Sequence, residues 1–392
     1  MKEVVIASAV RTPIGSFGGS LASIPATELG ATVIGGSIKA AKIRPEDVNE
    51  VIMGNVLTAG EGQAPARQAA LKAGLPNTTP ATTVNKVCAS GMKSVMYAVN
   101  QIQGGEGDVI IAGGMESMSN VPFYLPQMRN GNKLGHAEVQ DGILRDGFID
   151  VYKNYHMGNA AEVCAREHGF SREDQDAYAI ESYTRAKRAQ KEGWFNDEIL
   201  KIKIRGRKGD VTEVTQDEEV NRVDFDKMKS LRPVFDKEGT ITAANASTIN
   251  DGAAALVLMS ADKASELKIK PMARILGQAS AAKDPEWFTT APADAIPLAL
   301  KRAGLTIPDI DLFEINEAFS VVSLANNKLL ALDPAKVNIQ GGAVSMGHPI
   351  GCSGARILVT LLHALIRTGG RYGCAGICNG GGGASAVIIE RI

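Results

Sequence analysis

The sequence carries no excess of charge of either sign, since 42 lysines and arginines stand against 43 aspartates and glutamates and the formal net charge is −1. This balance indicates neither a nucleic acid nor an anionic membrane surface as a partner. We find no apolar run that approaches the length of a membrane span. The run at 4–10 is too short for a signal peptide and is typical of a first strand. These absences predict a cytoplasmic protein without membrane or nucleic-acid partners.

Cysteine is scarce and scattered. The five cysteines are Cys88, Cys164, Cys352, Cys374 and Cys378. An odd number spread over a long chain argues against a disulfide framework. His348 and Cys352 are four residues apart, as are the last two cysteines, and this spacing suggests a metal site. Glycines flank these residues, however, and no close ligand pair is repeated, so the sequence argues against a bound transition metal.

Glycine, by contrast, is abundant, and the chain repeats part of its own pattern. Residues 43–55 (IRPEDVNEVIMGN) and 306–316 (TIPDIDLFEIN) each open with a proline-containing turn and continue as an apolar strand. Ser-Gly pairs at 90–91 and 353–354 each head an apolar helix that leads to another strand. Alternating strands and helices predict an α/β protein built from two similar halves, with chance similarity as the alternative.

The composition changes between these halves. Residues 120–220 are richer in charged side chains, and a helix is predicted over 171–192 with Ser171 as its N-cap. The basic run at 201–208 (KIKIRGRK) is typical of a solvated edge strand, although contact with a phosphorylated ligand is the alternative. We interpret this region as an insertion that covers one face of the duplicated core.

The stretch 84–95 (VNKVCASGMKSV) places Cys88 where a short strand gives way to a helix. The apolar residues Met92, Val95 and Val99 then recur at helical spacing. A helix N-terminus offers unpaired N–H groups and a positive dipole end, which favour the thiolate, and the thiolate is the nucleophile. Cys88 is therefore a candidate nucleophile, with a buried core cysteine as the alternative.

Three short motifs in the second half carry groups suited to acyl chemistry. Asn316 ends a predicted strand, where a carboxamide can hold a water or an oxyanion. His348 stands between glycine and proline on a short loop, a fixed position that suits a base. Cys378 enters the four-glycine turn 380–383, whose N–H groups can face a negative oxygen. Taken singly, an Asn or His of this kind is more often structural.

With these motifs in place, the chain resembles the thiolase family, and within it the acetoacetyl-CoA thiolases. The resemblance runs nearly end to end, through VNKVCASGMKSV, AGGMESMS, YHMG, TAANASTINDGAAALV, EINEAFS, GGAVSMGHPIGCSGARI and ICNGGGGASA. It implies a thiolase-like, duplicated α/β fold of α-β-α-β-α layers with an inserted loop domain. The N-terminal half would comprise 1–119 and 250–269, the loop domain covering the coenzyme A site 120–249, and the C-terminal half 270–392.

The activity that this resemblance implies is that of an acetyl-CoA C-acetyltransferase, the reversible Claisen condensation of two acetyl-CoA to acetoacetyl-CoA plus CoA. Cys88 would take the acyl group, and His348 would accept its proton and face the thioester oxygen. Cys378 would remove the α-proton of the second acetyl-CoA. Asn316 would hold a water that forms one oxyanion hole with His348, and the N–H groups of Cys88 and Gly380 would form the other.

The resemblance also assigns residues to the coenzyme A thioesters, which would be the substrates, with no cofactor required. These are His156 and Met157 for the pantetheine channel, Ser247 for a further contact with it, Phe288, Ala318 and Phe319 for the acyl pocket, and Arg222 for the nucleotide. Some members of the family bind K⁺, and the corresponding positions here are Tyr183, Ala243, Ala244, Ala246 and Val344. Backbone oxygens are hard ligands suited to such a cation, with no ion as the alternative.

Two other functions remain open at this point. A degradative 3-ketoacyl-CoA thiolase for longer chains would use the same catalytic residues and differ only in pocket size. A non-catalytic acyl-CoA or lipid carrier on this fold is disfavoured because all four catalytic side chains are present. Related thiolases are homodimers or homotetramers, and the segment 121–134 favours a tetramer.

Overall fold

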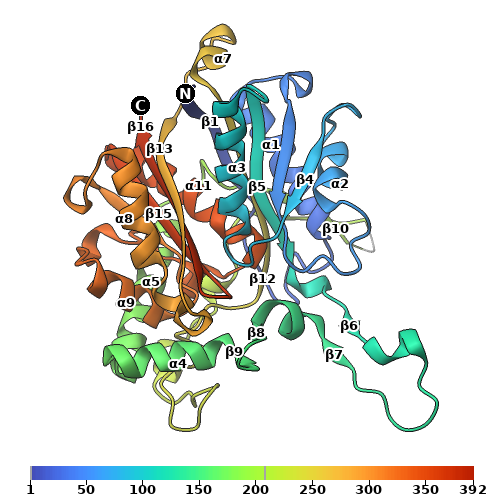
Figure 1. The fold of residues 1–392 in the computed structure, drawn as a ribbon, viewed down its shortest axis with the longest axis vertical. Coiled ribbons are helices and arrows are strands. Elements are labelled where there is room, and N and C mark those ends of the chain that lie inside the picture. The colour runs from blue at the N-terminus through green and yellow to red at the C-terminus, as the bar shows by residue number, and fades with distance from the viewer. Residues whose placement is uncertain (1, 207–208) are drawn as a thin grey trace.

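The computed structural model describes residues 2–206 and 209–392, and its core is a mixed sheet flanked by helices (Figure 1). The strands are β1 (Val4–Arg11), β2 (Gly15–Ser16), β3 (Glu50–Gly54), β4 (Ala81–Val84), β5 (Val109–Ser117), β6 (Phe123–Tyr124), β7 (Gln140–Asp141), β8 (Ile149–Asp150), β9 (Tyr155–His156), β10 (Ile202–Arg205), β11 (Val211–Val214), β12 (Asn250–Ser260), β13 (Ala273–Ala282), β14 (Leu312–Ile315), β15 (Tyr372–Asn379) and β16 (Gly383–Arg391). The α-helices are α1 (Ala26–Ala41), α2 (Pro65–Lys72), α3 (Ser90–Gly104), α4 (Met157–His168), α5 (Arg172–Lys191), α6 (Phe225–Met228), α7 (Ala261–Glu266), α8 (Pro292–Ala303), α9 (Ser320–Leu329), α10 (Ala343–Met346) and α11 (Ile350–Thr368).

The sheet and its helices form five layers. The strand order is β14-β15-β16-β13-β1-β12-β5-β3-β4, and β1 joins the two halves by pairing with β13. The helices α3 and α11 lie between the halves, where their apolar side chains share a buried cluster with strands of both. The outer face of the first half is covered by α1 and α2, and that of the second by α8. This α-β-α-β-α arrangement confirms the predicted fold class.

The two halves follow the same chain path. Residues 43–55 and 306–316 each form a short 3-10 helix followed by a strand, β3 or β14. Each of these strands pairs in parallel with the strand that follows the buried helix, β3 with β5 and β14 with β15. Each of those then pairs antiparallel with a long strand, β5 with β12 and β15 with β16. The weak sequence repeat therefore reflects a duplicated topology.

The two buried helices touch at the glycines of the repeated Ser-Gly pairs. A Cβ added at Gly91 would lie 2.8 Å from the backbone nitrogen of Ala355, and one at Gly354 would lie 2.4 Å from that of Met92. Backbone atoms cannot yield to such an overlap as a flexible side chain can. Glycine is therefore required where α3 and α11 meet, close to the loops that carry Cys88 and His348.

We expect Gly354→Ala to destabilise the protein by about 2–3 kcal/mol, because the new methyl group overpacks a contact between two backbones. Gly104 offers a matched control, since it also lies in one of these helices and a Cβ there would meet nothing within 4 Å. Gly104→Ala should stabilise the protein by about 0.5–1 kcal/mol through helix propensity. Denaturant unfolding of both variants measures the two effects. Equal stabilities would show that the glycine contact does not matter.

The sequence suggested that no apolar run approaches the length of a membrane span, but helix α11 does so. Its length and apolar composition are those of a membrane-spanning helix, yet 83% of its most apolar window is buried inside the protein. Strands of both halves pack against this helix, so most of its surface is apolar. Its hydropathy therefore reflects its place in the middle layer of the core.

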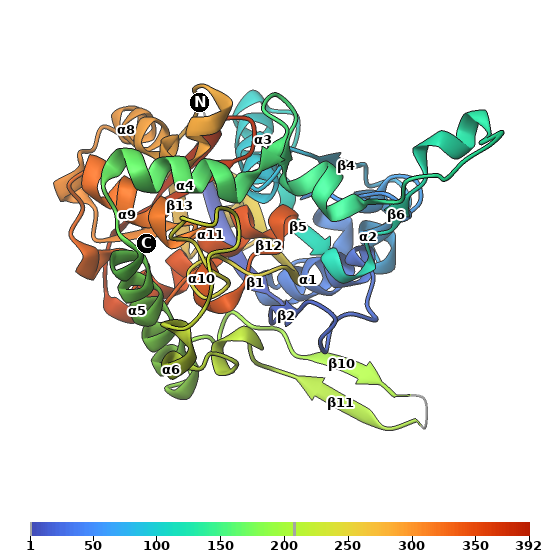
Figure 2. The ribbon, with the colours of Figure 1, turned by 90° about the horizontal axis from the view of Figure 1, so that it is seen from below.

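The insertion between the halves holds α4, α5 and α6 and two extensions that project from the body (Figure 2). The predicted helix at 171–192 is α5, and the side chain of Ser171 accepts a hydrogen bond from the backbone of Asp174, as an N-cap does. In the basic run, β10 pairs with β11 in a two-stranded hairpin, while residues 207–208 lie outside the described residues. The proposed domain boundaries stay predictions; β12, which begins the segment 250–269, pairs with β1 and β5 of the first half.

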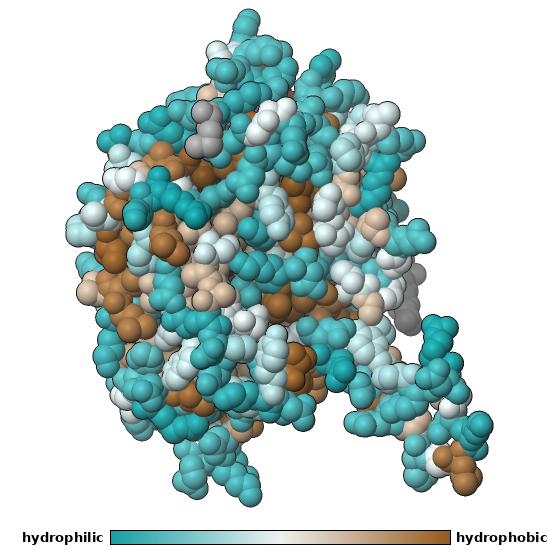
Figure 3. Space-filling model, in the orientation of Figure 1, coloured by the Kyte–Doolittle hydropathy of each residue, from teal (hydrophilic) through white to brown (hydrophobic). Residues whose placement is uncertain are grey.

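The second extension is an arm of residues 123–141, bounded by β6 and β7, that carries apolar side chains into solvent. Figure 3 shows an apolar group at its tip. The exposed apolar residues of the arm are Phe123, Leu125, Met128, Leu134 and Val139, and Leu134 is 96% exposed. Apolar side chains gathered on a projecting segment are typical of an interaction surface.

Candidate active site

A pocket of about 660 Å³ opens where the insertion meets both halves of the core. The first half contributes Cys88, and the second contributes His348 and Gly380. The seven residues expected to contact a coenzyme A thioester all line it as well: His156, Met157, Arg222, Ser247, Phe288, Ala318 and Phe319. Residues from distant parts of the sequence thus meet around one cavity.

Cys88 is presented by a strained loop between β4 and α3. Val87, immediately before it, has φ +48°, a left-handed conformation that a β-branched residue adopts only at a cost of about 1–3 kcal/mol. Ser90 holds the loop: its hydroxyl accepts a hydrogen bond from the N–H of Lys86 at 2.8 Å and donates to the Val87 carbonyl at 2.6 Å. No local sequence signal marks Val87 as strained.

The Cys88 thiol faces the turn that follows Cys378. Its sulfur accepts hydrogen bonds from the N–H of Gly380 and from its own N–H, the two groups predicted to form an oxyanion hole. Burial nevertheless raises the pKa of Cys88 to about 12, because removal from water outweighs these two bonds. Desolvation therefore outweighs the stabilising effect of the N–H groups at the helix N-terminus on the thiolate, and the thiol requires a base.

His348 supplies a neutral imidazole beside this thiol. Burial and, to a smaller extent, the charge of Arg356 lower the pKa of His348 to about 3. The N–H of His348 donates to Asn250 Oδ1 at 2.9 Å, which fixes the loop after α10. Because an uncharged imidazole accepts a proton at neutral pH, His348 is suited to the role of base.

Two contacts define the tautomer of this imidazole. Nδ1 lies 2.6 Å from the hydroxyl of Ser353, which itself donates to the Pro349 carbonyl at 3.0 Å, so that Nδ1 carries the hydrogen. Nε2 lies 3.4 Å from Nδ2 of Asn316, a donor that requires a lone pair. The lone pair of His348 is therefore on Nε2. In the sequence, Ser353 is recognisable only as the start of a helix, and no local signal indicates its contact with His348.

Asn316 and Cys378 sit at the ends of neighbouring strands, β14 and β15. The carboxamide oxygen of Asn316 is buried and has no hydrogen-bond partner among the described residues, so it can accept from a water or ligand. Cys378 is buried in an apolar cluster that includes Met157, Phe288 and Phe319, beneath the pocket. Burial raises the pKa of Cys378 well above its usual value, and the nearby Cys88 adds to this.

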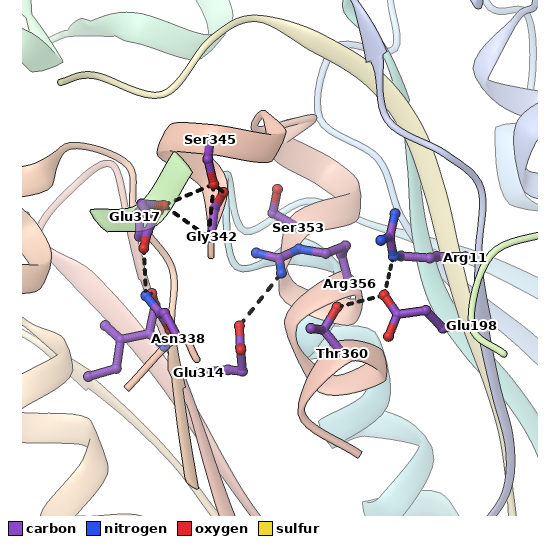
Figure 4. Close-up of polar contacts among 12 residues, drawn as sticks. Arg11, Glu198, Glu314, Glu317, Asn338, Gly342, Ser345, Ser353, Arg356 and Thr360 are labelled. Atoms are coloured by element: carbon purple, nitrogen blue, oxygen red, sulfur yellow. Dashed lines mark hydrogen bonds and ion pairs between the residues drawn. The ribbon is translucent and has the colours of Figure 1, made fainter. Parts of the chain in front are cut away.

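A buried polar network holds Glu317, the residue that follows Asn316 (Figure 4). The carboxylate of Glu317 accepts hydrogen bonds from Tyr178 and Ser182 at 2.9 and 2.8 Å. It also accepts from Asn338 Nδ2 and the N–H of Val344, each at 3.0 Å. Four donors on three other segments thus fix the residue next to Asn316, an arrangement that no local motif predicts.

Aromatic rings line the insertion side of the pocket. The imidazole of His156 stacks on Phe235 with a centroid distance of 4.6 Å and lies 5.4 Å from Phe148. Burial lowers the pKa of His156 to about 4, so the ring is neutral, and its Nδ1 accepts a hydrogen bond from Gly158 at 2.9 Å. The sequence analysis did not identify Phe148 or Phe235, which no motif distinguishes from core aromatics.

The polar contacts at the mouth are weaker. The side chain of Arg222 is 62% exposed and lies 3.6 Å from Glu219, which leaves it free to reach an anionic ligand. The hydroxyl of Ser247 donates to the Ala318 carbonyl at 2.8 Å and so ties the insertion to the second half.

The residues expected around K⁺ lie in two places, a buried cluster and the wall of the large pocket. Tyr183, Ala244 and Val344 share a buried cluster, while Ala243 and Ala246 line the large pocket. Within residues 2–206 and 209–392, the carbonyl oxygens of these three alanines and of Val344 accept no hydrogen bond from another residue outside their own helix. Burial raises the pKa of Tyr183, and the charge of Glu219 adds to this. Hard oxygen donors near a carboxylate fit a monovalent cation, whereas the described residues contain no His, Cys, Asp and Glu cluster for a transition metal.

Comparison with known proteins places this site in a family. The models of the thiolase N-terminal and C-terminal domains match residues 4–262 and 269–391. The chain is 55% identical to the acetyl-CoA acetyltransferase of Schizosaccharomyces pombe over 100% of this chain and 99% of the relative. It is 58% identical to the mitochondrial acetyl-CoA acetyltransferase of Rattus norvegicus, over 100% and 92%. The crystal structure of the Ascaris suum Acat5 thiolase in complex with coenzyme A superposes with a TM-score of 0.95 at 46% identity, with both chains fully covered.

Proposed function

The chain belongs to the thiolase family, and from this premise we propose that it is an acetyl-CoA C-acetyltransferase. It condenses two acetyl-CoA to acetoacetyl-CoA plus CoA and catalyses the reverse thiolysis through an acyl group on Cys88. The observation that carries the proposal is the pocket in which Cys88, His348 and Gly380 meet the seven coenzyme A residues. Relatives 53–58% identical over the whole of this chain bear the name of this activity.

The first half-reaction transfers an acetyl group to Cys88. The Cys88 proton moves to Nε2 of His348, and the sulfur attacks the thioester carbonyl of acetyl-CoA. The N–H groups of Cys88 and Gly380 hold the resulting oxyanion, as they hold the sulfur in the structure. The C–S bond to coenzyme A then breaks, and the leaving thiolate takes the proton of Cys378. Cys378 is left as a thiolate beside a protonated His348.

The second half-reaction forms the carbon–carbon bond. The Cys378 thiolate removes the α-proton of a second acetyl-CoA, and its thioester oxygen is held by Nε2–H of His348 and a water on Asn316. Acetylation of Cys88 helps here, because the acetylated sulfur cannot ionise and so cannot place a second negative charge beside the Cys378 thiolate. The carbanion attacks the acetyl carbonyl, the Cys88 thiolate leaves, and His348 returns its proton to it. Desolvation of the imidazolium favours this return.

The proposal is tested by comparing thiolysis of acetoacetyl-CoA, 2-methylacetoacetyl-CoA and a six- or eight-carbon 3-ketoacyl-CoA. Because Phe288, Met157 and Phe319 pack together beside Cys378, we expect the eight-carbon substrate to lose at least about tenfold in kcat/KM relative to acetoacetyl-CoA. Comparable values for both would instead identify a thiolase of broad chain length. Absence of thiolysis with every substrate would leave only a carrier function.

A cation held by Tyr183, Val344 and the carbonyls of Ala243, Ala244 and Ala246 is part of this proposal. K⁺ there would order the loop 242–248, which carries Ser247 and lines the pocket. Its chemistry would be electrostatic only. Replacing K⁺ by a bulky organic cation should raise KM for the coenzyme A thioester, and an unchanged KM would exclude the site.

We also propose that the protein is a homotetramer in which the arm of residues 123–141 contacts a second copy of the chain. The exposed apolar residues of the arm support this assembly, and sedimentation of a variant with Leu134→Asp and Met128→Asp tests it. A variant that still sediments as a tetramer would contradict the role of the arm. The cytoplasmic location stays a prediction from the sequence.

A further inference from the structure

Lys86, two residues before Cys88, forms hydrogen bonds with the opposite half of the protein. Its Nζ donates hydrogen bonds to Ser280 Oγ at 3.1 Å and Ser385 Oγ at 2.9 Å, and to the Ala384 carbonyl at 3.2 Å. The acceptors lie on β13 and β16, in the half of the protein opposite to Cys88. Three acceptors match the three hydrogens of an ammonium group. This side chain therefore bridges the two halves next to the nucleophile.

The acceptors are close to the other half of the catalytic machinery. In the antiparallel pair of β15 and β16, Ala384 is the register partner of Cys378, and Gly383 is the partner of Asn379. Gly380, which follows directly, donates its N–H to the Cys88 sulfur. Lys86 thus binds the same strand pair that holds Cys378 and shapes the oxyanion hole.

The loop around Cys88 needs such a restraint. Val87 stands between Lys86 and Cys88 with φ +48°, so the loop is held in a conformation that it would leave if released. Among the described side chains of residues 84–90, only those of Lys86 and Cys88 hydrogen-bond to the opposite half. Among the described residues, the acceptors of Lys86 Nζ are two hydroxyls and a carbonyl, with no carboxylate. Burial, together with the charge of Lys93, lowers the pKa of Lys86 to about 8. The hydrogen bonds across the halves are thus its principal stabilising contacts.

We propose that Lys86 is a positioning residue, which holds the Cys88 sulfur at reacting distance from Cys378 and from the N–H of Gly380. The inference rests on the proposed function, because those three groups must act on one substrate. Lys86 does not line the pocket, so it acts through the loop and not by contact with the substrate. Its role is to transmit the position of β16 to the strained loop.

The test compares Lys86→Met with Lys93→Met. Lys93 is a matched control, since it is a lysine of the same segment whose side chain lies over the ring of Tyr97, at 4.6 Å, and makes no hydrogen bond to the opposite half among the described residues. We expect Lys86→Met to lower kcat by about 10- to 100-fold through misplacement of the nucleophile, with KM for acetyl-CoA within about twofold of the wild-type value. Lys93→Met should change neither.

Cross-linking of Cys88 to Cys378 distinguishes a positioning role of Lys86 from a purely structural one, because it depends on the distance between the two sulfurs. A short bis-alkylating reagent such as 1,3-dibromoacetone should link Cys88 to Cys378 in the wild type and in Lys93→Met. In Lys86→Met it should modify Cys88 singly, with little cross-link. Cross-linking of Lys86→Met to the same extent as the wild type would overturn the proposal. A raised KM and a lower melting temperature in Lys86→Met, without loss of the cross-link, would do so as well. The cross-linking reaction needs no turnover. If the wild type lacked thiolase activity but still cross-linked more than Lys86→Met, the proposed function would be refuted and the positioning role of Lys86 would remain.

Discussion

Cys88→Ala should abolish the transfer of labelled acetyl from acetyl-CoA to the protein and lower turnover by at least about 10⁴-fold. The reason is that the variant loses the atom that forms the acyl-enzyme, while the pocket and the oxyanion hole remain. Both oxyanion donors are backbone groups, at Cys88 and Gly380, so the substitution leaves them in place. Mass spectrometry of the protein after incubation with acetyl-CoA measures the effect.

Cys374→Ala is the control for this experiment, because Cys374 belongs to the second half and is buried in its outer cluster, away from the pocket. It should retain acetylation. Stable acetylation of another cysteine in Cys88→Ala, at a rate near that of the wild type, would contradict the assignment of the nucleophile.

Cys378→Ser should separate the two half-reactions. Exchange of the α-protons of acetyl-CoA with deuterated water should fall by about 10²- to 10⁴-fold, the usual contribution of a general base. A hydroxyl is far harder to ionise than a thiol, so serine cannot replace the base. Acetylation of Cys88 should persist within about tenfold of the wild-type rate, since in the variant His348, which has accepted the Cys88 proton, can protonate the leaving coenzyme A in place of Cys378.

Deuterium exchange and acetyl transfer, measured on the same preparation of Cys378→Ser, show whether Cys378 is needed mainly as the base of the second half-reaction. An equal loss of both, in a variant that melts at the wild-type temperature, would show that Cys378 does not act separately from Cys88. A melting temperature well below that of the wild type would instead trace the loss to the apolar cluster around Cys378, and Cys378→Ala, which adds no polar group, would then replace serine in the comparison.

The sequence by itself determined the family, the fold class and the candidate residues. Short-range patterns were enough to place Cys88 at the junction of a strand and a helix, now β4 and α3. The repeated Ser-Gly pairs predicted two similar halves. The residues named by resemblance for the coenzyme A arm all line one pocket. Such features depend on local periodicity, or on motifs short enough to be read directly along the chain.

Only the tertiary structure decided how these residues are charged and held. The thiol of Cys88 is not a resting thiolate, because burial costs the charged form more than the local N–H groups return. The tautomer of His348 depends on Ser353 and Asn316. The bridge from Lys86 reaches Ser280 and Ser385, which are 194 and 299 residues further along the chain. Desolvation and contacts between distant segments arise only when the chain is packed, so no local pattern in the sequence encodes them.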